Sequence, residues 1–534
     1  MNEFLIRTED IDNSELLKIF VETKQDRELV EMLKNRTPVV LIGSRGVGKS
    51  FLMKVAAAEL KRDFAEKHVL PVYLTFIKST LVSVKQKGSF LNWMLAKICS
   101  KIIRELKNMG LIVNPSTSVD ILSGGSSKNY ESTKIESISL AYENSWRNEE
   151  KVSNEEVPTV EDFKMAIEDI CEENNIQRIV LFIDEAAHNF IQEQQDQFFT
   201  LFRDLRCAKI SCKAAVYPGV TAYGDSFQAS QDATMISLNR PISDDHYVES
   251  MKNMVLQQIS DSTYIKELSR KGEVFTVLTY AASGNPRFLL KTMASLSKLG
   301  TAEANQSIKD FYRVAILEDH SILARKYINL VDLINWGRKF LEDNLLPEMQ
   351  RRNSEALQND KPTTCWFWIS DRAPAAVHRA ISLLEYSGLV QMVNQGYKAS
   401  QGEIGTRYMV NYGCLIALES NPISVAMNVI RRLDKRRIVE FGANSAAYSD
   451  IKDNLQAINQ NDISDSLENL LGKNLDELGL SWNMKQKLHT LGLQTIKDVL
   501  NSTEEKLKEA YYVGNVRARY MKSVALNSVY EYLI

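Results

Sequence analysis

A glycine-rich segment at residues 43–50 has the residue types needed to bind phosphate. It reads Gly43-Ser44-Arg45-Gly46-Val47-Gly48-Lys49-Ser50, which fits the P-loop pattern G-x-x-x-x-G-K-[ST]. Glycines allow the backbone to point successive N–H groups at a phosphate, and the positive end of a following helix strengthens that field. Lys49 is then expected to neutralise the β- and γ-phosphates, and Ser50 to ligate Mg²⁺ through its hydroxyl. All eight residues are therefore candidate nucleotide-binding residues.

Two adjacent carboxylates end an apolar run further along the chain. The run from Ile179 to Ile183 is followed directly by Asp184 and Glu185. At the carboxyl end of a buried strand, Asp184 can bind Mg²⁺ directly or through water, and Glu185 can orient or deprotonate an attacking water. Such a pair can also serve as a helix cap. Combined with the P-loop, it predicts Mg²⁺-dependent hydrolysis of ATP rather than binding alone.

Fast turnover needs more positive charge near the γ-phosphate than Lys49 and Mg²⁺ supply, so arginines are of interest. Arg287, in Gly284-Asn285-Pro286-Arg287, begins a predicted helix and could reach back over the nucleotide. Arg203 and Arg206 lie on the helix after the carboxylates and could reach the nucleotide of a neighbouring subunit. Each of the three could instead be an ordinary surface arginine.

The hydrophobic pattern indicates which elements hold these residues in place. A short apolar run at 38–42 leads into the P-loop, and a helix follows from Lys49 to about residue 64. Further apolar runs at 69–77, 179–183, 214–217 and 235–238 are separated by polar helical segments. Strands that are apolar on both faces and alternate with helices are typical of a parallel sheet covered on two sides. Residues 1–243 are therefore predicted to form an α/β P-loop core, with a poorly patterned insertion at 83–156.

The remainder of the chain divides into four predicted segments. Residues 244–329 show only helical patterns and form a predicted helical lid. Residues 330–430 have the order helix, helix, β-hairpin, which is that of a winged helix. Residues 431–473 are polar and are expected to be a linker, whereas 474–534 contain short helices separated by glycine turns.

These motifs together resemble the AAA+ branch of the P-loop ATPases, in particular its initiator-type group of origin-recognition and cell-division-control ATPases. The STAND signal-transducing ATPases are near relatives. The resemblance rests on residues 43–50, 179–185, 218–221 and 284–287 and extends over about residues 10–320. It implies a five-stranded sheet, a helical lid, a following winged helix, nucleotide-dependent oligomers and ATP-gated engagement of DNA. It also implies that Thr221 senses the γ-phosphate and that Arg287 is the sensor arginine of the lid.

The last 60 residues resemble the paired helix-hairpin-helix module at the carboxyl end of the RNA polymerase α subunit. The likeness is carried by residues 475–481, 491–496 and 513–517. In such a module a glycine hairpin, here Gly514, aims backbone N–H groups at a phosphate of DNA, and nearby cations add charge. The candidate cations are Arg517, Arg519 and Lys522, with Arg379 of the winged-helix-like region as a further candidate. A protein-docking role for the tail remains an alternative.

Composition limits the remaining possibilities. The formal net charge is −3, from 65 Lys+Arg and 68 Asp+Glu, so DNA contact would have to come from local patches. No uncharged apolar run of about 18 residues and no amino-terminal leader is seen, which favours the cytoplasm. The six cysteines form no CxxC pair, which argues against zinc.

We therefore expect a Mg²⁺-dependent ATPase that changes conformation and self-association with nucleotide and engages DNA, in DNA transactions or in anti-phage defence. The alternative is a signalling or scaffold ATPase that docks and licenses a protein effector such as a nuclease.

Overall fold

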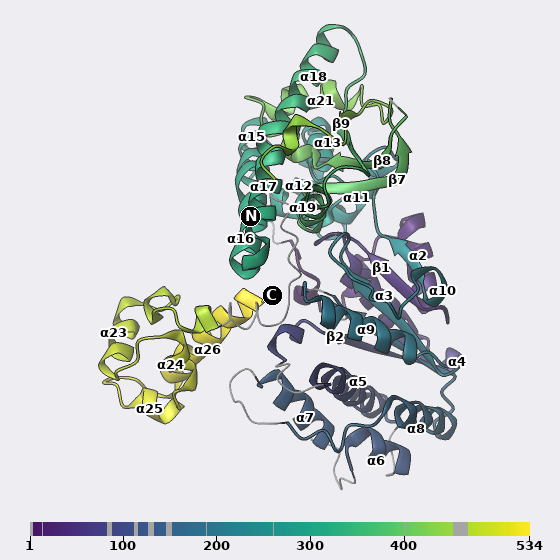
Figure 1. Cartoon of the computed structure of the whole chain (residues 1–534), viewed down its shortest axis with the longest axis vertical. Helices are drawn as coiled ribbons and strands as arrows, with labels where there is room; N and C mark the ends of the chain where they lie inside the picture. Colours follow the sequence, from purple (N-terminus) through teal and green to yellow (C-terminus); the bar gives the residue numbers. More distant parts are fainter. Residues whose placement is uncertain are drawn as a thin grey trace.

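The computed structural model describes most of the chain, with parts of the 83–156 insertion and of the expected linker outside it. The described residues are 4–12, 14–82, 88–111, 116–125, 133–145, 152–187, 189–259, 261–400, 402–451 and 468–533. Figure 1 shows a central sheet, helices of the insertion below it, a second helical and sheet region above it, and the carboxyl-terminal module to one side. None of the described helices has the length and hydropathy needed to span a bilayer.

The central sheet has five parallel strands in the order β2-β3-β4-β1-β5. Their bounds are β1 (Val39–Ile42), β2 (Val69–Thr75), β3 (Arg178–Asp184), β4 (Ile210–Val216) and β5 (Thr234–Ser237). Every residue of β4 is buried, as expected for a strand covered on both faces. The predicted α/β class with a parallel sheet is confirmed.

The strand order places the two halves of the predicted site across from each other. β4 lies between β1, which leads into the P-loop, and β3, which ends at Asp184. Two strand spacings separate the P-loop from the carboxylates, about 10 Å. Both lie at the carboxyl edge of the sheet, where α/β proteins bind their ligands.

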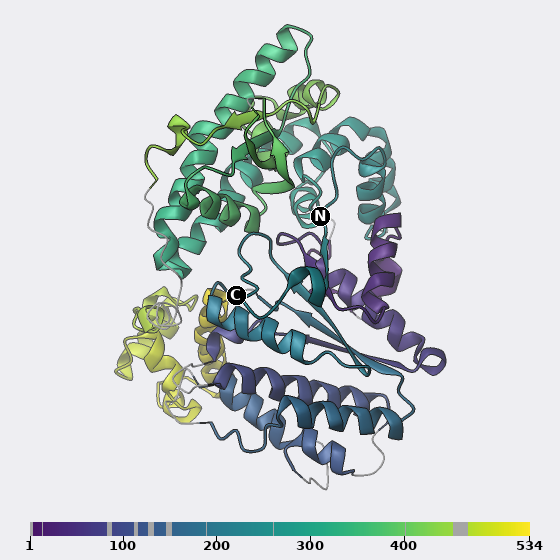
Figure 2. The ribbon, with the colours of Figure 1, turned by 45° about the vertical axis from the view of Figure 1, so that its right-hand side comes forward.

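Helices cover both faces of this sheet (Figure 2). On one face α2 (Lys24–Lys34) and α3 (Lys49–Arg62) pack against β1 and β3 in one apolar cluster. On the other face α5 (Ser89–Asn108), α8 (Val160–Glu173) and α9 (Gln192–Asp204) form a second cluster. Within the expected insertion, α5 is followed by α6 (Thr117–Ser123) and α7 (Lys134–Glu143), and α5 and α7 pack against each other. The insertion therefore extends the helical layer on one face of the sheet.

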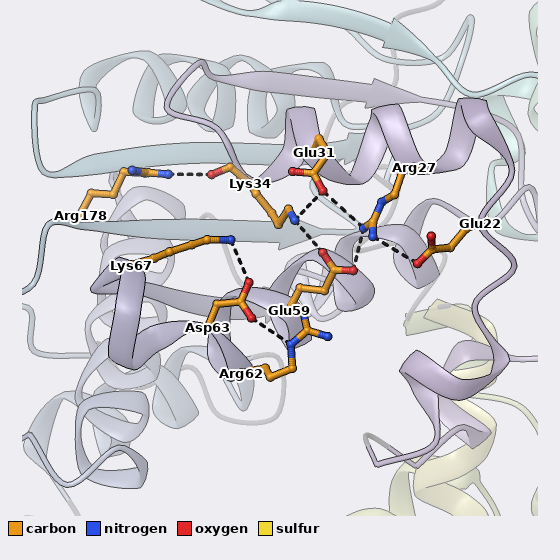
Figure 3. A network of polar contacts seen from close by, with 9 residues as sticks. All are labelled: Glu22, Arg27, Glu31, Lys34, Glu59, Arg62, Asp63, Lys67 and Arg178. Atoms are coloured by element: carbon orange, nitrogen blue, oxygen red, sulfur yellow. Dashed lines mark hydrogen bonds and ion pairs between the residues drawn. The ribbon is translucent and has the colours of Figure 1, made fainter.

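A buried carboxylate joins α2 to α3 (Figure 3). Glu59 of α3 has a side chain only 6% exposed, and it pairs with Arg27 and Lys34 of α2, each at 2.7 Å. Glu31 accepts a further hydrogen bond from Lys34 at 2.7 Å. The network holds α2 against the helix that follows the P-loop.

Glu59→Ala should strongly destabilise the α/β core. Removing one partner of a buried ion pair leaves uncompensated charge, which costs about 3 kcal/mol of the free energy of unfolding. The midpoint of urea denaturation measures the effect. Glu22→Ala is the matched control, because Glu22 is 62% exposed and pairs with Arg27 at 3.4 Å; its effect should stay below about 1 kcal/mol. Equal effects of the two variants would contradict the prediction.

The lid and the winged-helix-like region share one apolar core. The main helices are α11 (Tyr247–Leu256), α13 (Gly272–Ala281), α14 (Pro286–Ala294), α16 (Ile316–Lys326), α17 (Val331–Lys339), α18 (Leu346–Gln358) and α19 (Ala375–Tyr386). The expected boundary at residue 329 is therefore not a break in packing. The remaining helices outside the tail are α1 (Leu16–Ile19), α4 (Phe64–Lys67), α10 (Ala229–Asp232), α12 (Ser262–Arg270), α15 (Thr301–Lys309), α20 (Tyr412–Ile416) and α21 (Pro422–Ile430).

A second sheet has the order β7-β8-β6-β9. Its strands are β6 (Trp366–Ser370), β7 (Val390–Lys398), β8 (Ile404–Val410) and β9 (Val439–Phe441). The antiparallel β7 and β8 form the expected hairpin. β9 pairs in parallel with β6, and Tyr448 beyond it is buried, so the packed region continues past residue 430 into the expected linker. Residues 452–467 of that linker lie outside the described part.

The carboxyl-terminal module has an apolar core of its own, beginning at Leu470. It contains α23 (Trp482–Thr490), α24 (Ile496–Asn501), α25 (Glu504–Lys508) and α26 (Asn515–Leu533). Ser481 caps α23, and Thr495 and Asp498 form a capping box on α24. The sequence predicts short helices separated by turns; α23, α24 and α25 are of this kind, whereas α26 is a 19-residue helix.

Candidate nucleotide site

The P-loop adopts a conformation that depends on its glycines. Gly46 and Gly48 have φ angles of +85° and +103°, which side chains disfavour. Lys49 begins α3 and is buried, and its Nζ donates to the carbonyl of Gly43 at 2.6 Å and to that of Ser44 at 3.1 Å. Burial lowers the pKa of Lys49 to about 8, against the opposing effect of the carboxylates of Glu185 and Asp184. The lysine thus points into the loop, as the motif predicts.

The lid contacts the P-loop directly. Asn285 donates its Nδ2 hydrogen to the carbonyl of Arg45 at 2.8 Å, and the backbone N–H of Arg287 donates to the carbonyl of Gly46 at 3.4 Å. A Cβ atom on Gly46 would lie 2.8 Å from the Cβ of Arg287, so a side chain there would force the two segments apart. Any movement of the P-loop is therefore transmitted to the start of α14.

Arg287 lies beside the P-loop, as predicted, with most of its side chain buried. Burial is the main cause that lowers the pKa of this guanidinium, and the charge of Arg45 adds to it. Within the described residues its Nε makes no hydrogen bond. A buried cation with an unsatisfied donor beside another cation is well placed to receive an anion.

A second arginine holds the P-loop in place and was not predicted. Arg240 follows β5, donates to the carbonyl of Val47 at 2.6 Å, and pairs with Asp26 of α2 at 2.8 Å. The side chains of Arg240 and Asp26 are only 9% and 3% exposed. No sequence motif marks either residue, because their contact joins positions more than 200 residues apart.

Asp184 and Ser50, the two predicted magnesium ligands, lie within hydrogen-bond distance of each other. Burial, and then the neighbouring carboxylate of Glu185, raises the pKa of Asp184, whereas hydrogen bonds from Tyr73 and Ser50 act in the opposite direction. Tyr73 of β2 donates its hydroxyl to Asp184 at 2.5 Å. In the described part of the chain no group of three or more His, Cys, Asp or Glu side chains could hold a metal. A magnesium ion at this place would thus depend on one carboxylate, one hydroxyl, phosphate oxygens and water.

Glu185 has an unusual backbone and a specific partner. Its φ is +52°, in the left-handed region that non-glycine residues seldom adopt and that is often found at functional sites. The hydroxyl of Tyr217 lies 2.7 Å and 2.8 Å from its two carboxylate oxygens. The ammonium of Lys49 lies 4.1 Å from the centre of the Tyr217 ring. Tyr217 therefore links the two halves of the site.

Thr221 lies shortly after β4, and its role as a sensor of the γ-phosphate stays a prediction. Its hydroxyl donates to the carbonyl of Tyr217 at 2.7 Å, within the turn after β4. Tyr217, directly after the last residue of β4, is the residue of this segment that contacts Glu185. Its position at the carboxyl end of a central strand was a signal available in the sequence.

The winged-helix-like region also reaches the site. Tyr386, the last residue of α19, packs edge-on against Tyr217 with ring centroids 4.9 Å apart, and the guanidinium of Arg45 lies 5.9 Å from its ring centre. Lys326, at the end of α16, is half-buried; desolvation and the charge of Arg45 lower its pKa to about 7, while Glu185 opposes this. The site is thus assembled from the sheet, the lid and the second domain, and neither Tyr386 nor Lys326 was predicted.

The other predicted arginines lie away from the P-loop of their own chain. Arg203 bonds to Asp204 and to the carbonyl of Ser226. Arg206 lines a hollow beside Ile210, at the amino ends of the strands. A contact of either residue with a neighbouring subunit stays a prediction.

Arg379, the predicted DNA-contacting residue of this region, lies on α19. Burial lowers the pKa of Arg379, which is only partly exposed. A Cβ atom on Gly219, in the turn after β4, would lie 2.7 Å from the Cβ of Ser382, so α19 packs closely against the α/β core. DNA contact through Arg379 stays a prediction.

The predicted DNA-contacting residues of the tail lie on its surface. Arg517 donates to the carbonyl of Tyr512 at 2.6 Å, Arg519 pairs with Glu504 at 3.2 Å, and Lys522 is partly exposed. The space beside Gly514 is open, with no atom within 4 Å of a Cβ placed there. Large apolar side chains also surround this turn, which the sequence analysis did not single out: Tyr511 is 82% exposed, Tyr512 72%, Val516 83% and Tyr520 49%.

Comparison with known proteins shows only distant likeness. No protein-family model and no curated protein matches the chain. The Aeropyrum pernix ORC1 protein, solved in complex with DNA, is 12% identical; the match covers 78% of this chain and 98% of that one, with a TM-score of 0.33. A DNA replication initiation factor is also 12% identical, over 63% of this chain and 84% of its own, with a TM-score of 0.27. Scores this low assign neither a family nor a function, so the conclusions below rest on the site itself.

Proposed function

We propose that this protein is a Mg²⁺-dependent ATPase of the AAA+ type in which nucleotide controls the position of the lid and of the winged-helix-like region. The observation that carries the proposal is the convergence of Lys49, the Ser50–Asp184 pair and Glu185 at the carboxyl edge of the sheet. Lys49 supplies a cation for the phosphates, Ser50 and Asp184 supply oxygen ligands for magnesium, and Glu185 supplies a base for the attacking water.

The residues present fit ATP with magnesium. The backbone N–H groups of a P-loop bind phosphates, and the orphaned guanidinium nitrogen of Arg287 supplies an unused donor beside the loop. Lys49 would exchange its hydrogen bonds to the carbonyls of Gly43 and Ser44 for bonds to phosphate oxygens. Ser50 and Asp184 would hold the magnesium ion, which neutralises phosphate charge when bound. Glu185 would accept the proton of the attacking water.

Tyr217→Phe should raise basal ATP turnover. One hydroxyl engages both carboxylate oxygens of Glu185, so it competes with water for the base. A hydrogen bond to a charged group contributes about 1.5 kcal/mol, and its loss would increase kcat about tenfold. Phenylalanine keeps the ring beneath Lys49, so the affinity for ATP should not change. Phosphate release measures kcat; an unchanged or lower kcat would contradict a restraining role for the hydroxyl.

We further propose that the ATPase engages DNA through its carboxyl-terminal module. Residues 480–534 contain eight Lys/Arg and five Asp/Glu, and Arg517, Arg519 and Lys522 lie on the helix that follows the Gly514 turn. Backbone N–H groups at a helix start and nearby cations together suit a phosphate of the DNA backbone. Contacts of this kind would depend little on sequence and strongly on salt.

Duplex DNA provides the test of this function. We expect DNA to stimulate phosphate release and its affinity to fall steeply between 50 and 200 mM salt. Replacing Arg517, Arg519 and Lys522 together by Gln should remove stimulation and reduce the slope of log K against log salt by about 2.7, at 0.9 per phosphate contact. Lys487→Gln, on α23 of the same module, is the control for the loss of one positive charge outside α26. Salt-independent binding, or a triple variant that behaves like this control, would rule out the tail as the DNA contact.

A protein partner is the second candidate for the same module. Phosphate contact does not require the exposed Tyr511, Tyr512 and Val516, whereas large exposed apolar patches commonly mark interaction sites. A Tyr512→Ser, Val516→Ser variant distinguishes the two uses. Unchanged DNA affinity in this variant would favour docking of a protein effector, and loss of DNA affinity would favour nucleic acid.

A further inference from the structure

A basic hollow lies at the opposite edge of the central sheet from the P-loop. Its volume is about 290 Å³, close to the lower end of small-molecule sites. Thr37 and Arg36 precede β1, Arg178 begins β3, and Arg206 follows α9. β3 is seven residues long, so the hollow lies about 20 Å from Asp184 at 3.3 Å per residue. It is therefore a separate place from the nucleotide site.

The side chains that line the hollow include positive charges but no carboxylate. Three of its lining residues are arginines and none is Asp or Glu. In the described part of the chain, the side chains of Arg36 and Arg206 form no ion pair, and both residues are exposed. Arginines brought together in this way repel one another unless an anion lies between them.

Arg178 is the fixed member of the set. Its guanidinium donates to the carbonyl of Lys34 at 2.8 Å, which ties it to the ion network of α2 (Figure 3). Its Nε is buried and has no hydrogen-bond partner among the described residues. Burial, and then the charge of Arg36, lowers the pKa of Arg178, with no carboxylate opposing them. A second nitrogen of the guanidinium donates to Gln177 at 3.2 Å, and one buried donor of this half-exposed cation remains unused.

A buried lysine holds the backbone of one residue that lines the hollow. Lys213, in the middle of β4, donates to the carbonyls of Asn35 and Thr37. Burial lowers the pKa of Lys213 to about 7, and the charge of Arg178 contributes to the lowering. Ser211 donates to the carbonyl of Arg36 at 2.9 Å, which holds the segment before β1 in place. The backbone around the hollow is therefore fixed while the arginine side chains of Arg36 and Arg206 are free to close on a ligand.

We propose that this hollow binds a phosphate group, held by Arg178 with Arg36 and Arg206. Guanidinium groups match the geometry of phosphate oxygens and bind them through paired hydrogen bonds. Three cations without an acidic neighbour suit a group that carries two negative charges. The phosphate could belong to a small phosphorylated molecule or to the backbone of a nucleic acid, and the experiment separates these sources.

The test uses the full chain carrying Lys49→Ala, so that phosphates do not enter the P-loop. Inorganic pyrophosphate and, separately, a DNA duplex are titrated into this protein and into the same protein with Arg36→Gln and Arg206→Gln. Both arginines are exposed and unpaired, so the added changes should leave the thermal unfolding midpoint unaltered. Arg104→Gln, at an exposed position of α5, is the matched control. Calorimetry measures pyrophosphate binding, and fluorescence anisotropy measures DNA binding.

We expect at least one of the two ligands to bind more than tenfold less tightly when Arg36 and Arg206 are replaced, with no change for Arg104→Gln. Loss of pyrophosphate binding would assign a small phosphorylated ligand. If only DNA binding is weakened, and the slope of log K against log salt falls by about 1.8 for two phosphate contacts, the ligand is the backbone of a nucleic acid. Equal binding of both ligands before and after the replacements would overturn the proposal. Because the P-loop is disabled throughout, this result does not depend on ATP hydrolysis.

Discussion

Glu185→Gln should reduce the rate of ATP hydrolysis by about 10²–10⁴-fold while leaving ATP bound, which is the usual contribution of a general base. Glutamine keeps the shape of the side chain and a hydrogen-bond acceptor for Tyr217 but does not take up a proton. The partner contact at 2.7 Å would thus be retained, and the fold with it. Single-turnover phosphate release measures the chemical step, and calorimetry measures the affinity for ATP.

Glu193→Gln is the matched control for this prediction. Glu193 lies in the first turn of α9, eight residues after Glu185, and is exposed. Its replacement removes the same charge from the same part of the chain and should not alter the rate. If Glu185→Gln hydrolyses ATP as fast as this control, the role of Glu185 as the base is wrong, and a protein that binds ATP without turnover becomes the better description.

Lys49→Ala should weaken ATP binding by about 10²-fold. Hydrogen bonds to charged groups contribute about 1.5–3 kcal/mol, and the upper end of that range corresponds to about two orders of magnitude in Kd. Lys49 is the one residue whose ammonium already lies among the P-loop carbonyls, at 2.6 Å from that of Gly43. Lys61→Ala is the control, since Lys61 lies on the same helix with its side chain 49% exposed. Calorimetric titration of both variants with ATP measures the difference.

The affinity for ATP should also depend on pH through Lys49. Burial lowers the pKa of this lysine to about 8, so its protonated fraction falls as pH rises through that value. The charged form attracts phosphate, and the Kd of the unmodified protein should therefore rise between pH 7 and pH 9. Lys49→Ala should lose this dependence. A Kd that stays constant across this interval in the unmodified protein would show that Lys49 remains charged throughout.

The contacts around Tyr217 suggest how nucleotide could control the second domain. Tyr217 contacts Glu185 on one side and Tyr386 on the other, and Tyr386 ends the helix α19. Phe190 stacks on Tyr327 at 4.3 Å, next to Lys326. A change in the position of Glu185 or of the P-loop would therefore disturb the surface on which α19 rests.

Local patterns in the sequence were sufficient to identify the elements closest to the chemistry. The P-loop, the strand that ends at Asp184 and the helix after Lys49 are each contained in a short continuous segment. Their hydrophobic periodicity and glycine positions depend on neighbours only a few residues away. The hairpin of β7 and β8 was predictable for the same reason, because its strands are adjacent in the chain.

Residues far apart in the sequence were not identified in this way. Arg240, Lys326 and Tyr386 carry no motif, and each acquires its role only because a helix or turn packs against the P-loop. β9 lies in a polar segment that resembled a linker. Its place in the second sheet depends on its pairing with β6, about 70 residues earlier in the chain. Long-range pairing of this kind leaves little trace in a local pattern.

The amino-acid sequence by itself determined that phosphate chemistry belongs at residues 43–50 and that a carboxylate pair ends a buried strand of a parallel sheet. Backbone conformation and hydrophobic alternation are short-range properties, which explains why these features could be derived from spacing alone. Only the tertiary structure decided that Tyr217 binds Glu185, that the lid bonds to the P-loop, and that three arginines meet at the far edge of the sheet. Those contacts form where separate helices, strands and turns pack together. Burial of apolar surface and pairing of opposite charges select the partners, and the spacing of residues along the chain does not specify them.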